Sequence, residues 1–583
     1  MRRWFTLICL ILFAFRLHAG TTGKIAGTVA DKETGNPLPG ANIMVSGMTL
    51  GSAADLNGQF SILNVPPGTC ALKVSMMGYQ AVTVTDVRVF IDQTTRVHVD
   101  LEMEAIEGEV VTVVAEKSII KEDVATSMTA VSGREIQELP VSSVENVATL
   151  QAGIQGGLQI RGGGADEALL LVDGITLRDP RNNNPVSSIA LSAVKEISIE
   201  RGGFNPEYGQ VRSGVVKTVT REGDRSSYYG SAEFKYSPPA AKHFGISPFD
   251  RNSNWLRPYF DDTVCWTGTD NRRWSEYQQL QYPYFEGWNK VSQRLMTDGN
   301  PDNDLSPLAA QRVYMWETRK QPALDQPDYN IDAGFGGPVP AIGKKLGGLR
   351  FFTSFRRYRE MLVVPLTRDD YVDYDWTAKI NSDITPAMKL EISGLGGKQF
   401  TMQQNWSYGY LRYPSVIAGV MGDRPGALFG TGEYSLTDIA HRGASAKLTH
   451  VLGKNTFYEI SLEHLQRKYQ SYPAAYRNQE KQYEVVPGYF VDEAPFGYHP
   501  DDEVGIVGML FGGFTSKRRD NTRVHVTTLK GDLSSQVDAN NLVNTGVEFS
   551  YNDLNFDYGI LSNYTDKRYD ERVRLHVDRK SVV

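Results

Sequence analysis

The stretch Ile197-Ser-Ile-Glu-Arg-Gly-Gly-Phe-Asn-Pro-Glu-Tyr-Gly209, followed by Ser213-Gly-Val-Val-Lys-Thr-Val-Thr220, decides the fold of this chain. It contains two apolar runs separated by a glycine turn, which predicts two strands. A related block precedes it: Gln159-Ile-Arg-Gly-Gly-Gly164 leads into Leu169-Leu-Leu-Val172, a short apolar run typical of a buried strand. The turn signal Asp173-Gly174 closes that run.

This ordered series from Leu158 to Thr220 resembles the plug domain of TonB-dependent outer-membrane receptors. A lone Arg-Gly-Gly would mean little, but the order of strand, glycine turn, Tyr-Gly and closing strand is specific. The resemblance implies an α+β plug over residues 118–223. The residues that carry the motif are Ile160, Arg161, Gly162, Asp173, Gly174, Arg201, Gly202, Tyr208, Gly209 and Gly214.

The composition favours β structure with many turns. The chain has 583 residues, with 55 Gly, 29 Tyr and 24 Phe. Its 61 Lys plus Arg against 68 Asp plus Glu give a net charge of −7. Nucleic-acid binding usually needs a basic footprint, so this class of partner is excluded.

The N-terminus has the pattern of a secretory signal peptide. Arg2 and Arg3 precede an apolar run from Trp4 to Phe15, and a cleavage site with a small residue, Ala19, follows. Residues 1–19 are therefore expected to be removed; the run is too short for a membrane span. Of the cysteines, only Cys70 and Cys265 would remain, in separate domains, so a disulfide framework is not expected.

Residues 22–104 show short alternating runs between turn signals, which predict a small β-sandwich of the prealbumin or immunoglobulin-like kind. The segments Pro39-Gly-Ala-Asn-Ile43, Asp55-Leu-Asn-Gly-Gln-Phe60 and Val65-Pro-Pro-Gly68 resemble the carboxypeptidase regulatory-like domain. In spite of its name, that module is not catalytic. It often precedes receptor plugs.

The linker over residues 105–117 contains a short β-branched run. At its position between sandwich and plug it resembles a TonB box, formed by Glu109, Val110, Val111, Thr112, Val113, Val114 and Ala115. An extended run of this kind can add to the edge of a partner's sheet. A last strand of the sandwich, or a plain linker, is the alternative.

Residues 224–583 show longer strands with one apolar and one polar face. Val372, Tyr374 and Trp376 alternate with Asp373 and Asp375. The same alternation recurs over residues 388–393, 458–463 and 543–551. Strands of this kind suit a transmembrane antiparallel β-barrel, with apolar side chains toward lipid and polar ones toward a wet lumen.

The connections favour that barrel over a soluble sandwich. Short turns are expected at residues 384–387, 453–455 and 537–541, and long excursions at about 238–328, 397–441 and 469–522. Short turns at one rim and long loops at the other are typical of outer-membrane barrels. Because lipid cannot satisfy an open sheet edge, the strands are expected to close into a ring.

The number of strands is too small for a complete barrel. About ten candidates follow Gly223, whereas plugged barrels of this family have about 22 strands. The last residues, Arg579-Lys-Ser-Val-Val583, also lack a terminal aromatic residue. We therefore expect an incomplete barrel in a C-terminally truncated chain; a smaller barrel is the alternative.

Catalytic motifs are missing from the sequence, so an enzyme is not expected. None of the eight His that remain after residue 19 is followed three residues later by Glu, and no pair has the spacing of a hydrolytic zinc site. No Gly-x-Ser-x-Gly elbow or phosphate-binding loop occurs. No cofactor is predicted.

One weak metal candidate lies in the first excursion, where acidic and amide residues fall at positions one, three, five and seven of a calcium-type loop. Position six is Asn303 and position twelve is Ala309, where glycine and glutamate are expected, so a solvated turn is the better interpretation. The candidate ligands are Asp298, Asn300, Asp302 and Asp304.

The same excursion is rich in tryptophan. Exposed aromatic side chains could bind sugars or a partner protein, but such a cluster is more often the core of a folded loop. The weak substrate-binding candidates are Trp255, Trp266, Trp274 and Trp288.

Taken together, these features predict TonB-dependent import across the outer membrane of a Gram-negative-type bacterium, with the sandwich in the periplasm. The resemblance implies that TonB and its inner-membrane energising complex drive the plug. It also implies an imported substrate such as a glycan, peptide or siderophore and, in some receptors, a surface lipoprotein. The alternative is a non-transporting receptor or adhesin that uses the barrel as an anchor in outer-membrane lipid.

Overall fold

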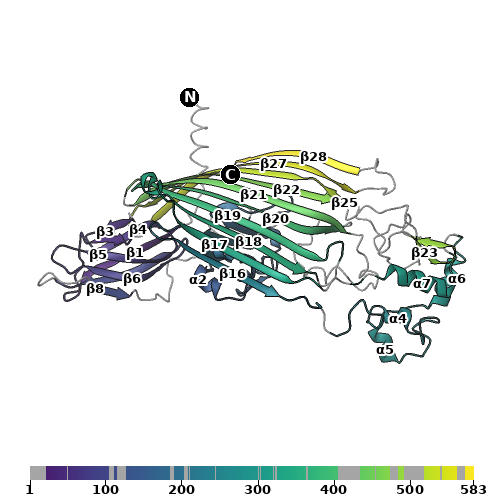
Figure 1. Cartoon of the computed structure of the whole chain (residues 1–583). Coiled ribbons are helices and arrows are strands. Elements are labelled where there is room, and N and C mark those ends of the chain that lie inside the picture. Colours follow the sequence, from purple (N-terminus) through teal and green to yellow (C-terminus); the bar gives the residue numbers. More distant parts are fainter. Residues whose placement is uncertain are drawn as a thin grey trace.

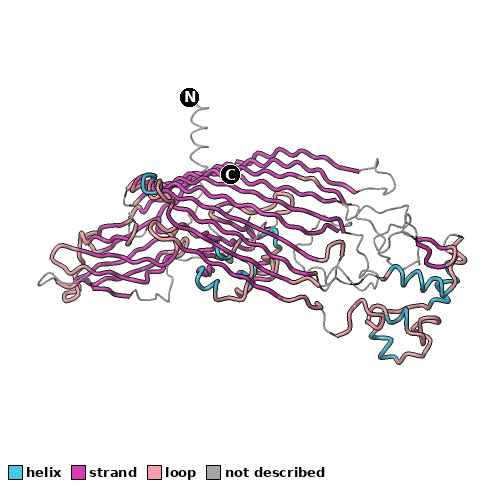
Figure 2. The backbone as a smooth tube through the Cα atoms, viewed as in Figure 1, coloured by secondary structure: helices cyan, strands magenta, loops and turns pink. Residues whose placement is uncertain are grey.

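The computed structural model describes residues 22–48, 50–103, 111–114, 127–183, 185, 189–202, 208, 211–242, 245–299, 301, 304–319, 321, 325–362, 366–404, 434–453, 455–472, 483–491, 518–538, 541–560 and 571–582. The predicted signal peptide lies outside these residues. A sandwich, a plug and a large curved sheet follow one another along the chain (Figure 1). Strands dominate, and most of the helical residues gather at the end of the sheet opposite the sandwich (Figure 2). The predicted fold class is confirmed. Within the described residues, no helix is both long and apolar enough to cross a bilayer.

The sandwich consists of two sheets that face each other across an apolar core. One sheet has the strand order β4-β1-β7 and the other β3-β2-β5-β6-β8. Alternate residues of the strands point inward, as at Ile25, Ile43 and Val74, all fully buried. The strands are β1 (Gly23–Asp31), β2 (Asn42–Val45), β3 (Gly51–Ala53), β4 (Gln59–Val65), β5 (Gly68–Ser75), β6 (Val82–Val89), β7 (Thr94–Leu101) and β8 (Val111–Val114).

The plug is built on a mixed five-stranded sheet with the order β13-β12-β15-β14-β9. Every residue of β15 is buried, because the strand lies in the middle of that sheet. Ser132 begins α2 with a capping box to Glu135, and Ser143 caps α3. The elements are β9 (Met128–Ser132), α2 (Gly133–Gln137), α3 (Val144–Thr149), β10 (Ile154–Gln155), β11 (Gln159–Ile160), η1 (Ala165–Glu167), β12 (Ala168–Val172), β13 (Ile175–Thr176), η2 (Leu191–Ala193), β14 (Val194–Glu200) and β15 (Gly214–Thr220).

The third part is an 11-stranded antiparallel sheet that curves around the plug (Figure 1). Strands β16 to β22 pair in sequence order. After them, β22 pairs with β26, β26 with β27, and β27 with β28. The short β25 lies between β22 and β27, as β26 does, and pairs with both. The strands are β16 (Tyr229–Ser237), β17 (Asp328–Pro338), β18 (Arg350–Met361), β19 (Asp370–Thr385), β20 (Met388–Gln404), β21 (Tyr434–Val451), β22 (Thr456–Tyr472), β25 (Arg518–Asp520), β26 (Arg523–Gln536), β27 (Leu542–Ile560) and β28 (Glu571–Val582). Within the described residues β16 pairs only with β17 and β28 only with β27, so the sheet is open.

The two faces of this sheet have the inverse of the usual burial pattern. On β19, Trp376 and Ile380 are 44% and 43% exposed, whereas Asp375 and Lys379 are 3% exposed. The polar side chains are buried because they face the plug. A sheet that turns its apolar side chains outward is suited to contact lipid, as the alternation predicted.

The predicted short turns are present, but the strands are longer than expected. Residues 386–387, 452–455 and 537–541 join consecutive strands at one end of the sheet. Pairing of β20 with β21 continues to Gln404 and Tyr434, well beyond the predicted boundaries at Gly397 and His441. The alternation continues into these outer ends, where Phe400 and Met402 alternate with Thr401 and Gln403, so the predicted boundaries ended the strands too early.

The first excursion folds into a helical unit at the end of the sheet that is remote from the sandwich (Figure 1). Its helices are α4 (Arg257–Phe260), α5 (Glu276–Gln281), α6 (Trp288–Leu295) and α7 (Pro307–Glu317), and a 3-10 turn η4 (Gly343–Leu346) follows β17. A small hairpin of β23 (Tyr483–Val486) and β24 (Tyr489–Val491), from the third excursion, contacts α7.

Candidate functional site

The interface between the plug and the inner face of the large sheet is the candidate functional site. Apolar side chains contribute on both sides, since Phe352 and Leu395 of the sheet join the core of the plug. The strongest contacts, however, are buried ion pairs and hydrogen bonds between charged side chains.

Asp173 forms the central ion pair between the plug and the sheet. The Asp173-Gly174 turn follows β12, and both residues have positive φ angles, +50° and +91°. In this conformation the Asp173 carboxylate accepts hydrogen bonds from the backbone N–H of Thr220 at 2.9 Å and from Nζ of Lys379 at 2.7 Å. Both side chains of the ion pair are almost fully buried, so neither charge has water as an alternative partner.

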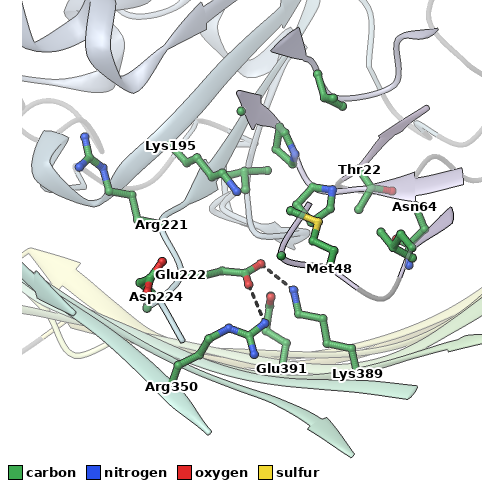
Figure 3. Close-up of a pocket in the computed structure, with 18 of the residues that line it drawn as sticks. Thr22, Met48, Asn64, Lys195, Arg221, Glu222, Asp224, Arg350, Lys389 and Glu391 are labelled. Carbon is green, nitrogen blue, oxygen red and sulfur yellow. Dashed lines mark hydrogen bonds and ion pairs between the residues drawn. The ribbon is translucent and has the colours of Figure 1, made fainter. Parts of the chain in front are cut away.

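Glu222 forms a second ionic contact, directly after the last plug strand. It accepts hydrogen bonds from Nζ of Lys389 at 2.7 Å and from Nη2 of Arg350 at 3.2 Å, as Figure 3 shows. Burial alone would raise the pKa of Glu222, but the surrounding positive charges, led by Lys389 and Lys195, hold it well below its ordinary value. Glu222 is therefore ionised at neutral pH.

A cavity of about 910 Å³ lies beside Glu222, where sandwich, plug and large sheet meet. Its lining includes Met48 and Asn64 from the sandwich, Lys195 from the plug and Glu391 from the sheet (Figure 3). Burial lowers the pKa of Lys195, which the negative charge of Glu222 partly offsets. Charged groups of both signs line this space, which makes it a polar chamber at the end of the sheet that carries the short turns.

A third contact lies at the opposite side of the plug, near the long loops. Arg181 of the plug binds Asp520 at 3.2 Å, and its guanidinium lies 3.2 Å from the centre of the Tyr469 ring. The Tyr469 hydroxyl donates a hydrogen bond to Asp179. Burial would raise the pKa of Asp179, but the charges of Arg181 and Arg467 together with the hydrogen bond from Tyr469 outweigh it and lower the pKa.

A row of polar side chains from four strands, β17, β18, β19 and β21, crosses the inner face of the large sheet. Asp332 accepts hydrogen bonds from the backbone N–H groups of Leu191 and Ser192 in the plug, at 2.6 and 3.2 Å. Asp332 lies opposite Arg356, which lies opposite Asp375.

His441 completes this row from one strand further away, at 3.1 Å from Asp375. It can do so because the residue between them is Gly397: a Cβ atom there would overlap both side chains. The glycine therefore permits a polar contact across an intervening strand.

The sandwich is attached to the plug by charged side chains as well. Lys217 in β15 lies 2.5 Å from Asp92 of the sandwich and 2.7 Å from Glu200 of the plug. Burial raises the pKa of Asp92, against the opposing effect of Lys217. Glu196 accepts a hydrogen bond from the backbone N–H of Ile91 at 2.9 Å.

The plug motif occupies structural positions in the plug. Ile160 is fully buried, and a Cβ atom at Gly214 would overlap its side chain, so the glycine lets β15 pass close to β11. Arg161, Gly162 and Gly202 have positive φ angles. Arg201 donates hydrogen bonds to the Ala152 carbonyl and to Thr129. The Tyr208 ring lies 4.6 Å from Nζ of Lys217; Gly209 lies outside the described residues.

The TonB-box-like segment is described only over Val111–Val114. These residues form β8, which pairs in parallel with β6 in the register Val82 to Val111 through Thr85 to Val114. These four residues are thus the edge strand of the sandwich sheet, which is the alternative that the sequence left open. Its role as a TonB box stays a prediction, and Glu109, Val110 and Ala115 lie outside the described residues.

The tryptophan candidates lie in or beside the core of the helical unit. Trp288 is fully buried and donates a hydrogen bond from Nε1 to the Tyr259 carbonyl at 2.9 Å; Trp274 is 4% exposed. Trp255 and Trp266 are partly buried against the same core. This burial supports packing rather than substrate contact.

The calcium candidate is only partly described. Asn300 and Asp302 lie outside the described residues, and no group of three or more potential metal ligands occurs among the residues that are described. Asp298 and Asp304 therefore stay weak candidates.

Sequence reasoning singled out Asp173 as a plug-motif residue, but not Glu222 or Arg181, and it did not identify the partners of any of the three. Asp375 was placed on the polar face of the strand that is now β19, and this was the available signal: charged residues at alternate positions that face a lumen. Nothing in the sequence indicated which plug residues they would meet.

Two family models match the chain. One, described as a CarboxypepD_reg-like domain, matches residues 25–113, and the other, the TonB-dependent Receptor Plug Domain, matches residues 120–216. The chain thus carries a carboxypeptidase regulatory-like domain followed by the plug domain of TonB-dependent receptors, a family of outer-membrane proteins.

The curated relatives of this chain are named as TonB-dependent transporters or receptors. The chain is 27% identical over 234 residues to the TonB-dependent transporter Oar of Myxococcus xanthus, an alignment that covers 37% of this chain and 22% of that protein. It is 27% identical over 241 residues to the TonB-dependent receptor P3 of Formosa agariphila, covering 37% of this chain and 23% of that protein. The matched region thus spans less than a quarter of either relative.

Among solved structures, the siderophore receptor PirA of Acinetobacter baumannii is similar with a TM-score of 0.43 and 10% identity, over 75% of this chain and 49% of that one.

Proposed function

We propose that this chain, which carries the plug domain of TonB-dependent receptors, works in energised import of a polar solute across the outer membrane. The large sheet forms part of the pore wall, the plug closes the pore, and the sandwich lies on the periplasmic side. The Glu109–Ala115 segment receives TonB. The chain has no catalytic role in this proposal.

The observation that carries the proposal is the chemistry of the interface between plug and sheet. Asp173, Glu222 and Arg181 each meet charged partners on the sheet, and Asp332 binds plug backbone N–H groups. Water can solvate such groups when they separate, whereas separating an apolar interface of the same size would expose surface that water does not stabilise. An interface of this type suits a plug that must move and return.

The position of the polar chamber supports transport toward the periplasm. It lies at the end of the sheet with the short turns, which in outer-membrane barrels is the periplasmic rim. The charged groups of its lining suit the passage of a hydrated solute.

The test is a pair of proline substitutions in the TonB-box-like segment. Proline removes the backbone donor that strand addition needs, so Val111→Pro with Val113→Pro should abolish growth on the nutrient that a gene deletion shows to be limiting. Receptor abundance and binding of that nutrient to the cell surface should stay unchanged. Lys117→Pro, just beyond the segment, is the matched control. Unchanged uptake in the double variant would favour a surface receptor that only anchors its loops.

A further inference from the structure

β8 is an unprotected edge strand. It pairs with β6 on one side, and within the described part of the chain no strand pairs with its other side. Its four residues, Val111-Thr-Val-Val114, include neither charge nor proline, and the pairing with β6 has no bulge. Natural edge strands usually carry at least one of these devices to prevent pairing with other chains.

The other edges of the sandwich do have such protection. The edge strand β3 has only three residues, Gly51–Ala53. The edge strand β7 exposes Arg96, His98 and Asp100 between its buried valines. The edge strand β4 has no charged residue, but its pairing with β1 is interrupted by a register shift between Gly23 and Ile25. Each of these three edges thus carries one such device and β8 carries none, with Val113 46% exposed.

From these observations we infer that a strand of TonB's periplasmic domain docks on the outer edge of β8, as the sixth strand of the sandwich sheet. This inference rests on the proposed assignment of Glu109–Ala115 as the TonB box. It goes further because it makes the sandwich part of the docking site. β8 stays on β6 and is presented to the partner already extended.

Two contacts support a presenting role for β6. The four paired positions hold the β8 backbone in the strand conformation, and the Thr85 hydroxyl donates a hydrogen bond to the Val113 carbonyl at 3.3 Å. Ordering a free segment costs conformational entropy on binding, and this cost is smaller when the segment is already fixed. The sandwich itself is held against the plug by Asp92 and Lys217.

The experiment measures binding of the purified periplasmic domain of TonB from the same bacterium to the full receptor. Deleting residues 22–103 removes β6 and leaves the segment in place. We expect this deletion to weaken binding by ~tenfold or more, because the segment must then be ordered during binding. Unchanged or tighter binding would overturn the inference.

A second variant keeps the whole sandwich. Thr83→Cys with Thr112→Cys places thiols at paired positions of β6 and β8, so that oxidation fixes β8 on β6. The oxidised receptor should bind the TonB domain as tightly as the reduced one. Loss of binding on oxidation, with recovery on reduction, would show that β8 must leave β6, and would overturn the inference while keeping the TonB box.

Binding that is absent already in the unmodified receptor, or that survives Thr112→Pro with Val114→Pro, whose N–H groups face away from β6 because the Val113 carbonyl faces it, would instead disprove the proposed TonB box itself. The failure of the further inference and the failure of the proposed function therefore give different results.

Discussion

The ion pair between Asp173 and Lys379 should hold the plug in the sheet, and its contribution can be measured with a double-mutant cycle. The two groups are 2.7 Å apart, and their side chains are 6% and 4% exposed. Removing one partner of a buried pair costs about 3–5 kcal/mol, because the other charge is left buried. Since Asp173 keeps its two hydrogen bonds to Thr220, we expect the lower end, about 3 kcal/mol, for Lys379→Met. That is about a hundredfold in the equilibrium for plug opening.

The assay uses a buried reporter in the plug. Ser198 is fully buried in β14, so the thiol in Ser198→Cys reacts with a maleimide only when the plug opens. Labelling rates with and without Lys379→Met give the change in opening free energy. Asp173→Asn should cost a similar amount, and the double variant less than either single one, since no unpaired charge remains. Costs that simply add, or a Lys379→Met cost below about 1 kcal/mol, would refute the reasoning.

Three further predictions concern other contacts. The folded-state pKa of Glu222 is lower than its ordinary value of 4.5, so the stability that its charge contributes is complete above pH 4.5 and is lost as the pH falls through the folded pKa. Glu222→Gln removes this charge, so the variant should lose less thermal stability on acidification than the unmodified receptor. Melting temperatures from neutral pH down to pH 3 test this. Gly397→Ala would place a Cβ against the Tyr374 carbonyl and between Asp375 and His441, so it should destabilise the receptor by about 1–3 kcal/mol, whereas Gly394→Ala, whose Cβ would meet nothing closer than 3.7 Å, should be nearly neutral in the same urea titration. Trp288→Ala should lower the stability of the helical unit by about 3–5 kcal/mol and make it sensitive to protease. Leu280→Ala, at an exposed position, is the control. Equal protease resistance of the two variants would contradict the role of Trp288 in the core.

Local patterns in the sequence were enough to predict the three parts of the fold. The glycine positions of the plug motif reflect local geometry: Gly162, Gly174 and Gly202 all need positive φ angles. The alternation on β19 reflects which face meets the plug and which is left outside. Information of this kind is present within a few residues of chain, so it can be recognised without knowing the partner.

The contacts that fix the plug could not be predicted, because they join distant segments. Asp173 and Lys379 are 206 residues apart, and Arg181 and Asp520 are 339 apart. Asp173 could have paired with any lysine or arginine on the polar face of the sheet, and Arg181 with any aspartate or glutamate there. The position of β8 was ambiguous for a different reason: a short β-branched run fits both a free segment and an edge strand, and only its pairing with β6 distinguishes them.

The arrangement of the sandwich has a mechanical consequence for the proposed import. A partner bound to β8 would be connected to the plug by two routes: the chain that continues from Val114 to the plug, and the sandwich, which binds the plug through Asp92 with Lys217 and Ile91 with Glu196. Lys217 lies in β15, the central strand of the plug sheet, between β12 with its Asp173 turn and β14. A pull that displaces the sandwich would therefore act on the same sheet that the ion pair of Asp173 and Lys379 holds. Loss of the contact between Asp92 and Lys217 should lower the force that reaches that ion pair, without changing the ion pair itself.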